Sequence, residues 1–407
     1  MTATMDVHKY ITVEWRSPRV FMILMAIAMP LSFSTWMALI NNFAVERVFF
    51  TGKEIGILQS LREIPGFLAF AVVFLLLLMR EQTLGLVALL FLGIGTAITG
   101  MLPTAVGLYA TTILMSVGFH YYETVRQSLA LQLVSKEESP LFLGQLVAVG
   151  SFSGLVSLCL IWLSVDLVGL DMEWVYFLGG SLTIMITLIC WKAFPKFPEK
   201  VRQHRKVFLR KRYWLYYLIT FLSGARRQIF VVFANFLMVE KFDFSVSDIT
   251  LLLLVNTTIN IFIAPKIGKF IAVCGERRAL TFEYIGLIGV FTAYAFVNTA
   301  WVAVLLYLVD HIFFSMAIAI KTYFQKIADP ADIAAQAGVA FSINHIAAVL
   351  VPVTLGFLWL ISPSIVFLVG AGLASASLAL ACLIPKNPSQ KNISIISDYK
   401  TFFSFPR

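Results

Sequence analysis

Apolar segments of about 20 residues recur along the whole chain, and this feature constrains the fold most. A helix needs about 20 mostly apolar residues to cross a bilayer. Hydrophobic residues make up 59% of the 407 residues, and charged residues only 13%. We expect an all-α integral membrane protein with twelve transmembrane helices, because the runs are too continuous for the alternating strands of a β-barrel. The predicted spans are residues 20–41, 55–79, 82–101, 104–129, 141–165, 173–194, 213–238, 249–273, 279–297, 299–325, 335–360 and 363–385.

Lysine and arginine in the connecting segments predict the orientation, because cytoplasmic loops carry an excess of these residues. The basic residues on the side of the two termini are Lys9, Arg16, Arg19, Arg80, Lys136, Lys266, Lys269, Arg277 and Arg278. The opposite connections hold few, and only Arg47, Lys53 and Lys241 depart from the pattern. We therefore expect both termini in the cytoplasm. We also expect the protein to reside in a bacterial inner membrane.

The longest connection is strongly basic. Residues 192–212 read "KAFPKFPEKVRQHRKVFLRKR", with nine Lys or Arg residues and one acid, and supply much of the formal net charge of +9. A nucleic-acid site is one interpretation. A lipid-facing linker between spanning segments explains the same charge more simply, so we expect no nucleic-acid partner.

An internal repeat divides the chain into two halves. Asn42-Phe43 in "NNFAVERVFF" matches Asn235-Phe236 in "ANFLMVEKF", at an offset of 193 residues. A repeat of half the spanning region is typical of two-bundle secondary transporters. We expect two six-helix bundles related by pseudo-two-fold symmetry. The predicted divisions are an N-terminal bundle at 1–194, a basic cytoplasmic linker at 195–212, a C-terminal bundle at 213–386 and a cytoplasmic tail at 387–407.

With these features the chain resembles the major facilitator superfamily over about residues 15–386. That family has a loop signature of Gly, three residues, Asp-Arg, one residue and Gly-Arg-Arg, and the chain has "GKFIAVCGERR". The chain keeps Gly268, Gly275, Arg277 and Arg278 but lacks the Asp-Arg pair, and the first-half copy is reduced to "MREQTLGL" around Arg80. The resemblance implies alternating access driven by an ion gradient, a monomer, and a gating role for these five residues.

Two adjacent arginines lie in the middle of the seventh predicted span. Arg226 is 14 residues from both Arg212 and Glu240, or roughly 21 Å along a helix, too far to reach an interface. Arginine inside a bilayer is costly and marks a candidate site. Adjacent residues diverge by about 100°, so we expect one of Arg226 and Arg227 to face the substrate cavity and the other to pair with another helix. The alternative is that acids neutralise both.

Further candidates for the substrate cavity lie in the first, second and fourth spans. Arg62 and Glu63 are adjacent in the second span, and we expect one to line the cavity and the other to pair across helices. Trp36 and Tyr121 are aromatic candidates for the cavity wall.

Acids and histidines inside the spans are candidates for proton coupling. His120, Glu123 and Arg126 follow one another at intervals of three residues and share a stripe of the fourth span. Glu123 is the leading proton carrier, and a static Glu123–Arg126 pair is the alternative. Asp310 is the second candidate. Glu63 and His311 complete the predicted proton-coupling set.

The interiors of the predicted spans contain four arginines (62, 126, 226 and 227) and, by this count, three acids (Glu63, Glu123 and Asp310). Because arginine suits carboxylate and phosphate, the surplus predicts a proton-coupled transporter of a small organic anion, with sodium as the alternative ion. The rival functions are an exporter of amphipathic drugs or siderophore-like compounds and a transport-inactive scaffold or receptor. No metal cluster, phosphate-binding loop or nucleophile motif is present in the sequence, so we expect neither an enzyme nor a cofactor.

Overall fold

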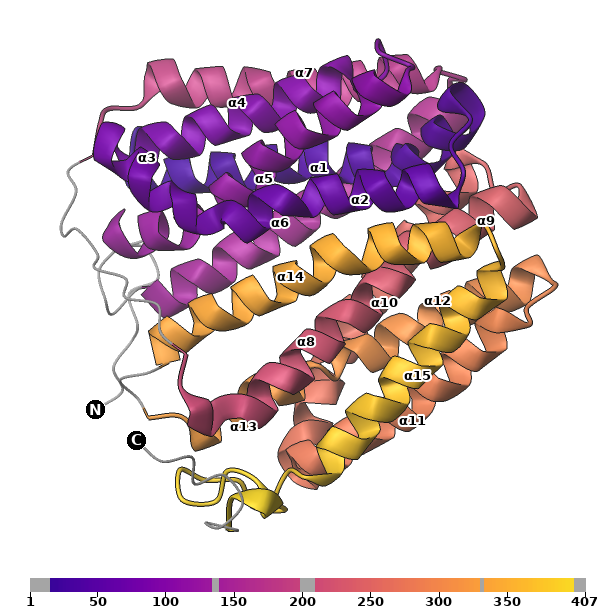
Figure 1. Ribbon diagram of the computed structural model, residues 1–407. Coiled ribbons are helices and arrows are strands. Elements are labelled where there is room, and N and C mark those ends of the chain that lie inside the picture. The colour runs from indigo at the N-terminus through magenta and orange to yellow at the C-terminus, as the bar shows by residue number, and fades with distance from the viewer. Residues whose placement is uncertain (1–14, 134–138, 198–208, 330–332, 399–407) are drawn as a thin grey trace, which may run out of the picture. The chain divides into compact units, whose positions relative to one another are not determined.

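The computed structural model describes residues 15–133, 139–197, 209–329 and 333–398. These residues form helices joined by short connections, and their only β contact is an isolated bridge between Ser389 and Asn392 (Figure 1). Lys136, much of the predicted linker and the end of the predicted tail lie outside the described residues. The all-helical prediction is therefore confirmed over the part of the chain that the structure describes.

The first half of the chain contains seven α-helices in its described part. They are α1 (Pro18–Val48), α2 (Gly52–Phe67), α3 (Val72–Leu78), α4 (Glu81–Thr99), α5 (Ala105–Leu133), α6 (Ser139–Trp162) and α7 (Met172–Ala193). A 3₁₀ segment, Leu68–Ala71, joins α2 to α3 shortly after Pro65 and Gly66. Both residue types weaken a helix, proline because it lacks an N–H donor and glycine because of its backbone freedom.

The second half contains eight α-helices in its described part. They are α8 (Trp214–Gln228), α9 (Asn235–Phe242), α10 (Val246–Cys274), α11 (Glu276–Ala295), α12 (Ala300–Ser315), α13 (Ile318–Ile327), α14 (Ile333–Trp359) and α15 (Pro363–Cys382). A π-helical segment, Ile229–Ala234, joins α8 to α9. A capping box starts α10, in which the Ser245 hydroxyl accepts from the backbone N–H of Asp248 and the Asp248 carboxylate accepts from the backbone N–H of Ser245.

Eight helical stretches in the described residues are long and apolar enough to cross a membrane. They are Pro18–Val48, Glu81–Thr99, Phe142–Leu167, Met172–Ala193, Val246–Cys274, Ala300–Ile327, Val339–Trp359 and Pro363–Cys382. The other four predicted spans are also helical, as α2 with α3, α5, α8 with α9, and α11. The protein is thus an integral multi-pass membrane protein, and the number of twelve crossings stays a prediction.

The chain forms two compact units that do not follow the sequence halves. The first unit contains residues 1–39 and 68–203, and the second contains 40–67 and 204–407. The boundary falls inside α1, and α2 belongs to the second unit. The predicted division at residues 194 and 213 stays a prediction.

In the first unit, α4 packs against both α5 and α7 (Figure 1). Glycine makes these contacts close: Gly118 of α5 lies against the backbone of Leu92 in α4, and Gly180 of α7 lies against the backbone of Gly93 and Ala97 in α4. Small residues let helix backbones approach in membrane proteins, where packing rather than water exclusion drives association.

In the second unit, α14 packs against α2 and α8, and α15 packs against α11 and α8. Gly56 of α2 lies directly against the carbonyl oxygen of Pro352 in α14, and Gly356 lies against the carbonyl oxygen of Gly52. The backbone N–H of Val353 donates to the Ser60 hydroxyl at 3.0 Å. These contacts place the charged part of α2 beside the helices that carry the site described below.

Candidate functional site

The two adjacent arginines of α8 point in different directions. Arg226 is buried, with 3% of its surface exposed, whereas the side chain of Arg227 is exposed. The helical rotation of about 100° between neighbours produces this difference. Arg226 is enclosed within the second unit, whereas Arg227 keeps an accessible side chain beside residues of α2 and α12 in the same unit.

Arg226 forms a buried ion pair with α11. Its Nη1 atom lies 3.6 Å from Oε1 of Glu283, whose side chain has no exposed surface. The guanidinium carbon also lies 4.4 Å from the ring centre of Tyr284. The predicted pairing of one arginine with another helix is therefore present, and Arg226 is the residue that makes it.

Asp310 of α12 is buried in the same region, with 3% of its surface exposed. Arg226 and Glu283 are the charged groups whose fields act on it. His311 turns back toward its own helix, because its Nδ1 lies 3.1 Å from the carbonyl oxygen of Tyr307. We call Arg226, Glu283 and Asp310 the buried charge cluster.

Arg227 has a different environment. Its guanidinium carbon lies 5.7 Å from the ring centre of Phe314 in α12. Glu63 and Arg62 of α2 are near enough for their opposite charges to act on it. Within the described residues, no carboxylate lies at ion-pair distance from Arg227, so its charge is exposed and lacks a direct acidic partner.

Arg62 and Glu63 do not separate as predicted. Their side chains contact each other in a buried ion pair, and Glu63 Oε2 also lies 3.7 Å from Nε2 of His345 in α14. The prediction of two different faces was wrong for the charged groups, because both side chains are long enough to curl together although their Cα atoms diverge. The contact across helices comes from Glu63.

The α5 candidates belong to the first unit. Glu123 and Arg126 form an ion pair at 3.0 Å, with 27% and 28% of their side chains exposed. His120 is buried, and its Nδ1 lies 2.9 Å from the hydroxyl of Ser116. The geometry of Glu123 therefore matches the static pair that was the alternative.

The two aromatic candidates also lie in the first unit. Trp36 of α1 is fully buried. Tyr121 packs against a buried apolar cluster that includes Val72, Leu84 and Val125. Both residues contribute to packing there, and a role in binding substrate stays a prediction.

The loop signature occupies the junction of α10 and α11. Gly275 separates the two helices with φ of +80°, a conformation that favours glycine. Gly268 and Arg278 are exposed, and Arg277 is half-buried. Arg80 is exposed just before α4.

Glu276, inside the loop signature, was not among the predicted residues. It is buried, and one of its oxygens lies 2.6 Å from Nζ of Lys326 at the end of α13. This ion pair ties the start of α11 to α13 in the second unit.

Glu283 is the main residue that the sequence reasoning missed. It is the single acid inside the apolar stretch "ALTFEYIGLIGVF", and that isolation was the available signal. Including it gives four acids for the four interior arginines (62, 126, 226 and 227). The predicted surplus of arginine was therefore wrong.

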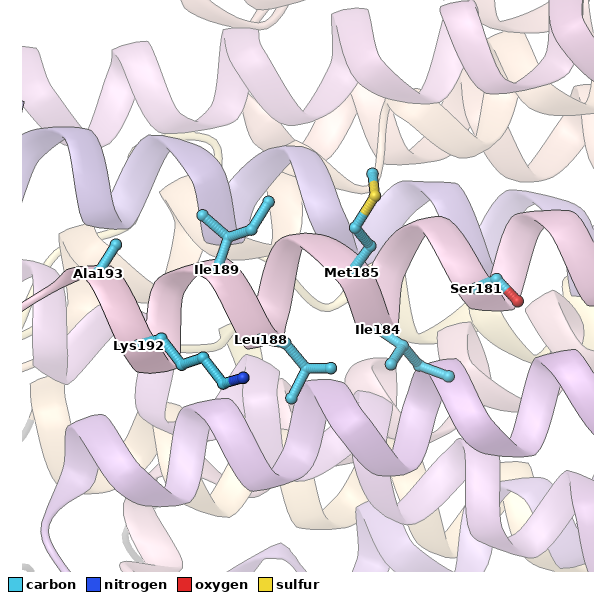
Figure 2. A pocket seen from close by; sticks show the side chains of 7 residues that line it. All are labelled: Ser181, Ile184, Met185, Leu188, Ile189, Lys192 and Ala193. Atoms are coloured by element: carbon cyan, nitrogen blue, oxygen red, sulfur yellow. The ribbon is translucent and has the colours of Figure 1, made fainter.

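The structure also has a surface groove on α7, in the first unit. Figure 2 shows that the lining side chains project from one helix and are mostly apolar. They are Ser181, Ile184, Met185, Leu188, Ile189, Lys192 and Ala193. A groove formed by a single apolar helix face is typical of a lipid-facing surface, and none of the candidate site residues lines it.

Comparisons with known proteins agree with this architecture. The family model described as Major Facilitator Superfamily matches residues 20–352. A comparison with curated protein sequences gives no match.

Several solved transporters have a similar structure. The nucleoside transporter NupG aligns with a TM-score of 0.73 and 15% identity, covering 89% of this chain and 98% of that one. A bacterial homologue of the human lysosomal transporter Spinster gives a TM-score of 0.72 and 12% identity, with coverages of 89% and 95%. A bacterial homologue of the iron transporter ferroportin gives 0.70 and 13%, with coverages of 89% and 97%. The chain is therefore a transporter rather than an enzyme, and it belongs to the major facilitator superfamily.

Proposed function

We propose that this chain is a proton-coupled secondary transporter of a small organic anion, working by alternating access of two six-helix halves. The observation that carries the proposal is Arg227. It lies within a predicted spanning segment, its side chain is exposed, and no described carboxylate pairs with it directly. A charged residue at the centre of a spanning helix costs about 2.5–3.5 kcal/mol on insertion scales and is usually functional.

The chemistry of Arg227 favours an anion. The guanidinium group stays charged and presents a planar fork of donors that matches a carboxylate or phosphate. Phe314 beside it offers an apolar surface for the rest of an organic solute. Arg226 and Arg62 have acidic partners, so the proposal rests on Arg227 and not on a general surplus of arginine.

Asp310 is the stronger of the two predicted candidates for proton coupling. Arg126 lies 3.0 Å from Glu123, and a close cation stabilises the ionised form of a carboxylate. Asp310 shares Arg226 with Glu283 instead. Sodium remains the alternative coupling ion.

The remaining parts of the proposal rest on the charge pattern of the connections and on the resemblance to the superfamily. Both termini lie in the cytoplasm, the protein resides in a bacterial inner membrane, and it acts as a monomer. The structurally similar proteins are named for nucleosides, a lysosomal transporter and iron. One fold hosts many substrates, so the substrate has to be found by binding.

The test is thermal stabilisation of the purified protein, because a ligand that binds the folded state raises its apparent stability. The panel contains carboxylates, phosphate esters, nucleosides, ferrous iron, sugars and cationic amphiphiles. We expect selective stabilisation by anions that is lost in Arg227→Ala. The matched control is Arg16→Ala, at an exposed arginine outside the predicted spans, which should respond like wild type.

The other outcomes decide between the rival functions. Stabilisation by cationic amphiphiles that persists in Arg227→Ala would favour the exporter. A protein that binds none of the compounds and moves none of them into proteoliposomes would favour the scaffold.

A further inference from the structure

The buried charge cluster of the second unit contains one cation and two acids. Arg226, Glu283 and Asp310 come from α8, α11 and α12, and their exposed fractions are 3%, 0% and 3%. If both acids were ionised, the cluster would carry a net charge of −1 in a region of low dielectric constant. A like charge and burial both disfavour the ionised form of a carboxyl group.

The hydrogen bonds of the cluster are incomplete. The Arg226–Glu283 distance of 3.6 Å exceeds that of a hydrogen bond. Both carboxylate oxygens of Glu283, Oδ1 of Asp310, and Nε and Nη2 of Arg226 have no hydrogen-bond partner among the described residues. Buried polar atoms are rarely left in this state, so the two carboxylates have oxygens available for a further positive charge.

Among the described residues, the surrounding helices supply no second cation to these acids. Tyr284 lies beneath the guanidinium of Arg226, and Tyr294 and Tyr307 are the tyrosines near Asp310. His311 is directed to the carbonyl oxygen of Tyr307, and α15 has no charged residue.

The other charged residues on the helices around the cluster either contact different residues or are accessible at the surface. His345 of α14 faces Glu63, and Lys326 of α13 pairs with Glu276. Arg277 is half-buried at the start of α11, and Glu240 accepts a hydrogen bond from Trp359. The others are exposed: Arg227, Lys241, Asp248, Lys266, Lys269, Arg278 and Lys321.

We propose that Glu283 and Asp310 share one exchangeable proton beside Arg226, and that this is the site where the transporter binds its coupling proton. Binding forms one O–H bond on a carboxylate oxygen, and release breaks that bond, while Arg226 stays charged throughout. The proton belongs to the pair of acids rather than to either residue. The coupling role rests on the proposed function, whereas the presence of the proton does not.

The test is infrared spectroscopy of the full-length protein in liposomes at neutral pH, because a protonated carboxyl has a carbonyl band that shifts in D₂O. We expect this band in wild type. Either Glu283→Gln or Asp310→Asn leaves one carboxylate for one guanidinium, so each single substitution should abolish the band. Glu276→Gln is the matched control, because Glu276 is a buried acid with a single cationic partner, and it should leave the band unchanged.

Three results would overturn the proposal: no band in wild type, a band of full intensity in either single variant, or loss of the band in the control. If Asp310→Asn fails to fold, Asp310→Glu serves instead, because it keeps both acids. That variant should keep the band at a shifted position, and an unshifted band would count against the site.

The same variants separate this inference from the choice of substrate. The infrared measurement needs no substrate, so it stands even if the anion panel finds nothing. Once a substrate is known, Glu283→Gln and Asp310→Asn should still exchange it across the membrane but lose accumulation driven by a pH gradient. Accumulation at the wild-type level would place the coupling proton elsewhere.

Discussion

Arg226 and Glu283 form an ion pair that links α8 to α11 inside the second unit, with Nη1 and Oε1 3.6 Å apart and neither side chain more than 4% exposed. The same arginine acts electrostatically on Asp310. The pair is therefore part of a cluster that contains one arginine and two acids.

Arg226 should be more important for stability than Glu283. Arg226→Gln leaves two buried acids without a cation, and we expect it to lower the free energy of unfolding by about 3–5 kcal/mol, the usual effect of breaking a buried pair. Glu283→Gln should cost clearly less, because the charge of Asp310 remains near enough to Arg226 to interact with it. Denaturant unfolding in mixed micelles measures both, and equal losses would contradict the shared role of Arg226.

Arg227 should control substrate affinity rather than stability. A hydrogen bond to a charged group contributes about 1.5–3 kcal/mol, so Arg227→Ala should weaken anion binding by about ten- to a hundredfold. Arg227→Lys keeps the charge but loses the planar fork, and it should bind with intermediate affinity. Titration of the best anion from the thermal panel gives the three dissociation constants. Equal affinity in all three proteins would remove Arg227 from the site.

Gly56 should be needed for the contact between α2 and α14. An added methyl group would meet the carbonyl oxygen of Pro352, and overpacking of this kind costs about 1–3 kcal/mol. Gly56→Ala should therefore lower the apparent Tm. Gly372 of α15 has open space around it, so Gly372→Ala is the control that should unfold like wild type.

The two glycines of the loop signature should respond differently to alanine. Gly275 has φ of +80° and ψ of +159°, a region where other residues are strained by about 1–3 kcal/mol. Gly268 lies inside α10 with no atom near its missing side chain, and alanine there should be neutral or stabilising by up to about 1 kcal/mol. Thermal unfolding compares the two variants. If Gly268→Ala keeps its stability but loses transport, Gly268 has a role in the transport cycle.

Much of the fold was accessible from the sequence because hydropathy is a local property. Each predicted span coincides with a helix or with consecutive helical segments. The positions where the α-helices are interrupted were harder to predict, such as the π-helical segment after Gln228. These interruptions depend on packing against neighbouring helices.

The candidate site was only partly accessible. Arg226 and Asp310 could be identified from their positions in apolar segments. Their membership of one buried charge cluster with Glu283 could not be predicted. Pairing between helices depends on which helices are neighbours and how each is rotated, and neither quantity is encoded in a single segment. The same limit explains why Arg62 and Glu63 were assigned to different faces although they contact each other.

Composition, periodicity and motif spacing along the chain were enough to predict a helical membrane protein that resembles one superfamily, because these properties are local. The burial and pairing of Arg226, the exposure of Arg227 and the packing of α2 with α14 became known only from the folded arrangement. These outcomes arise from contacts between segments far apart in the chain, where burial of charge and close approach at glycine select one arrangement.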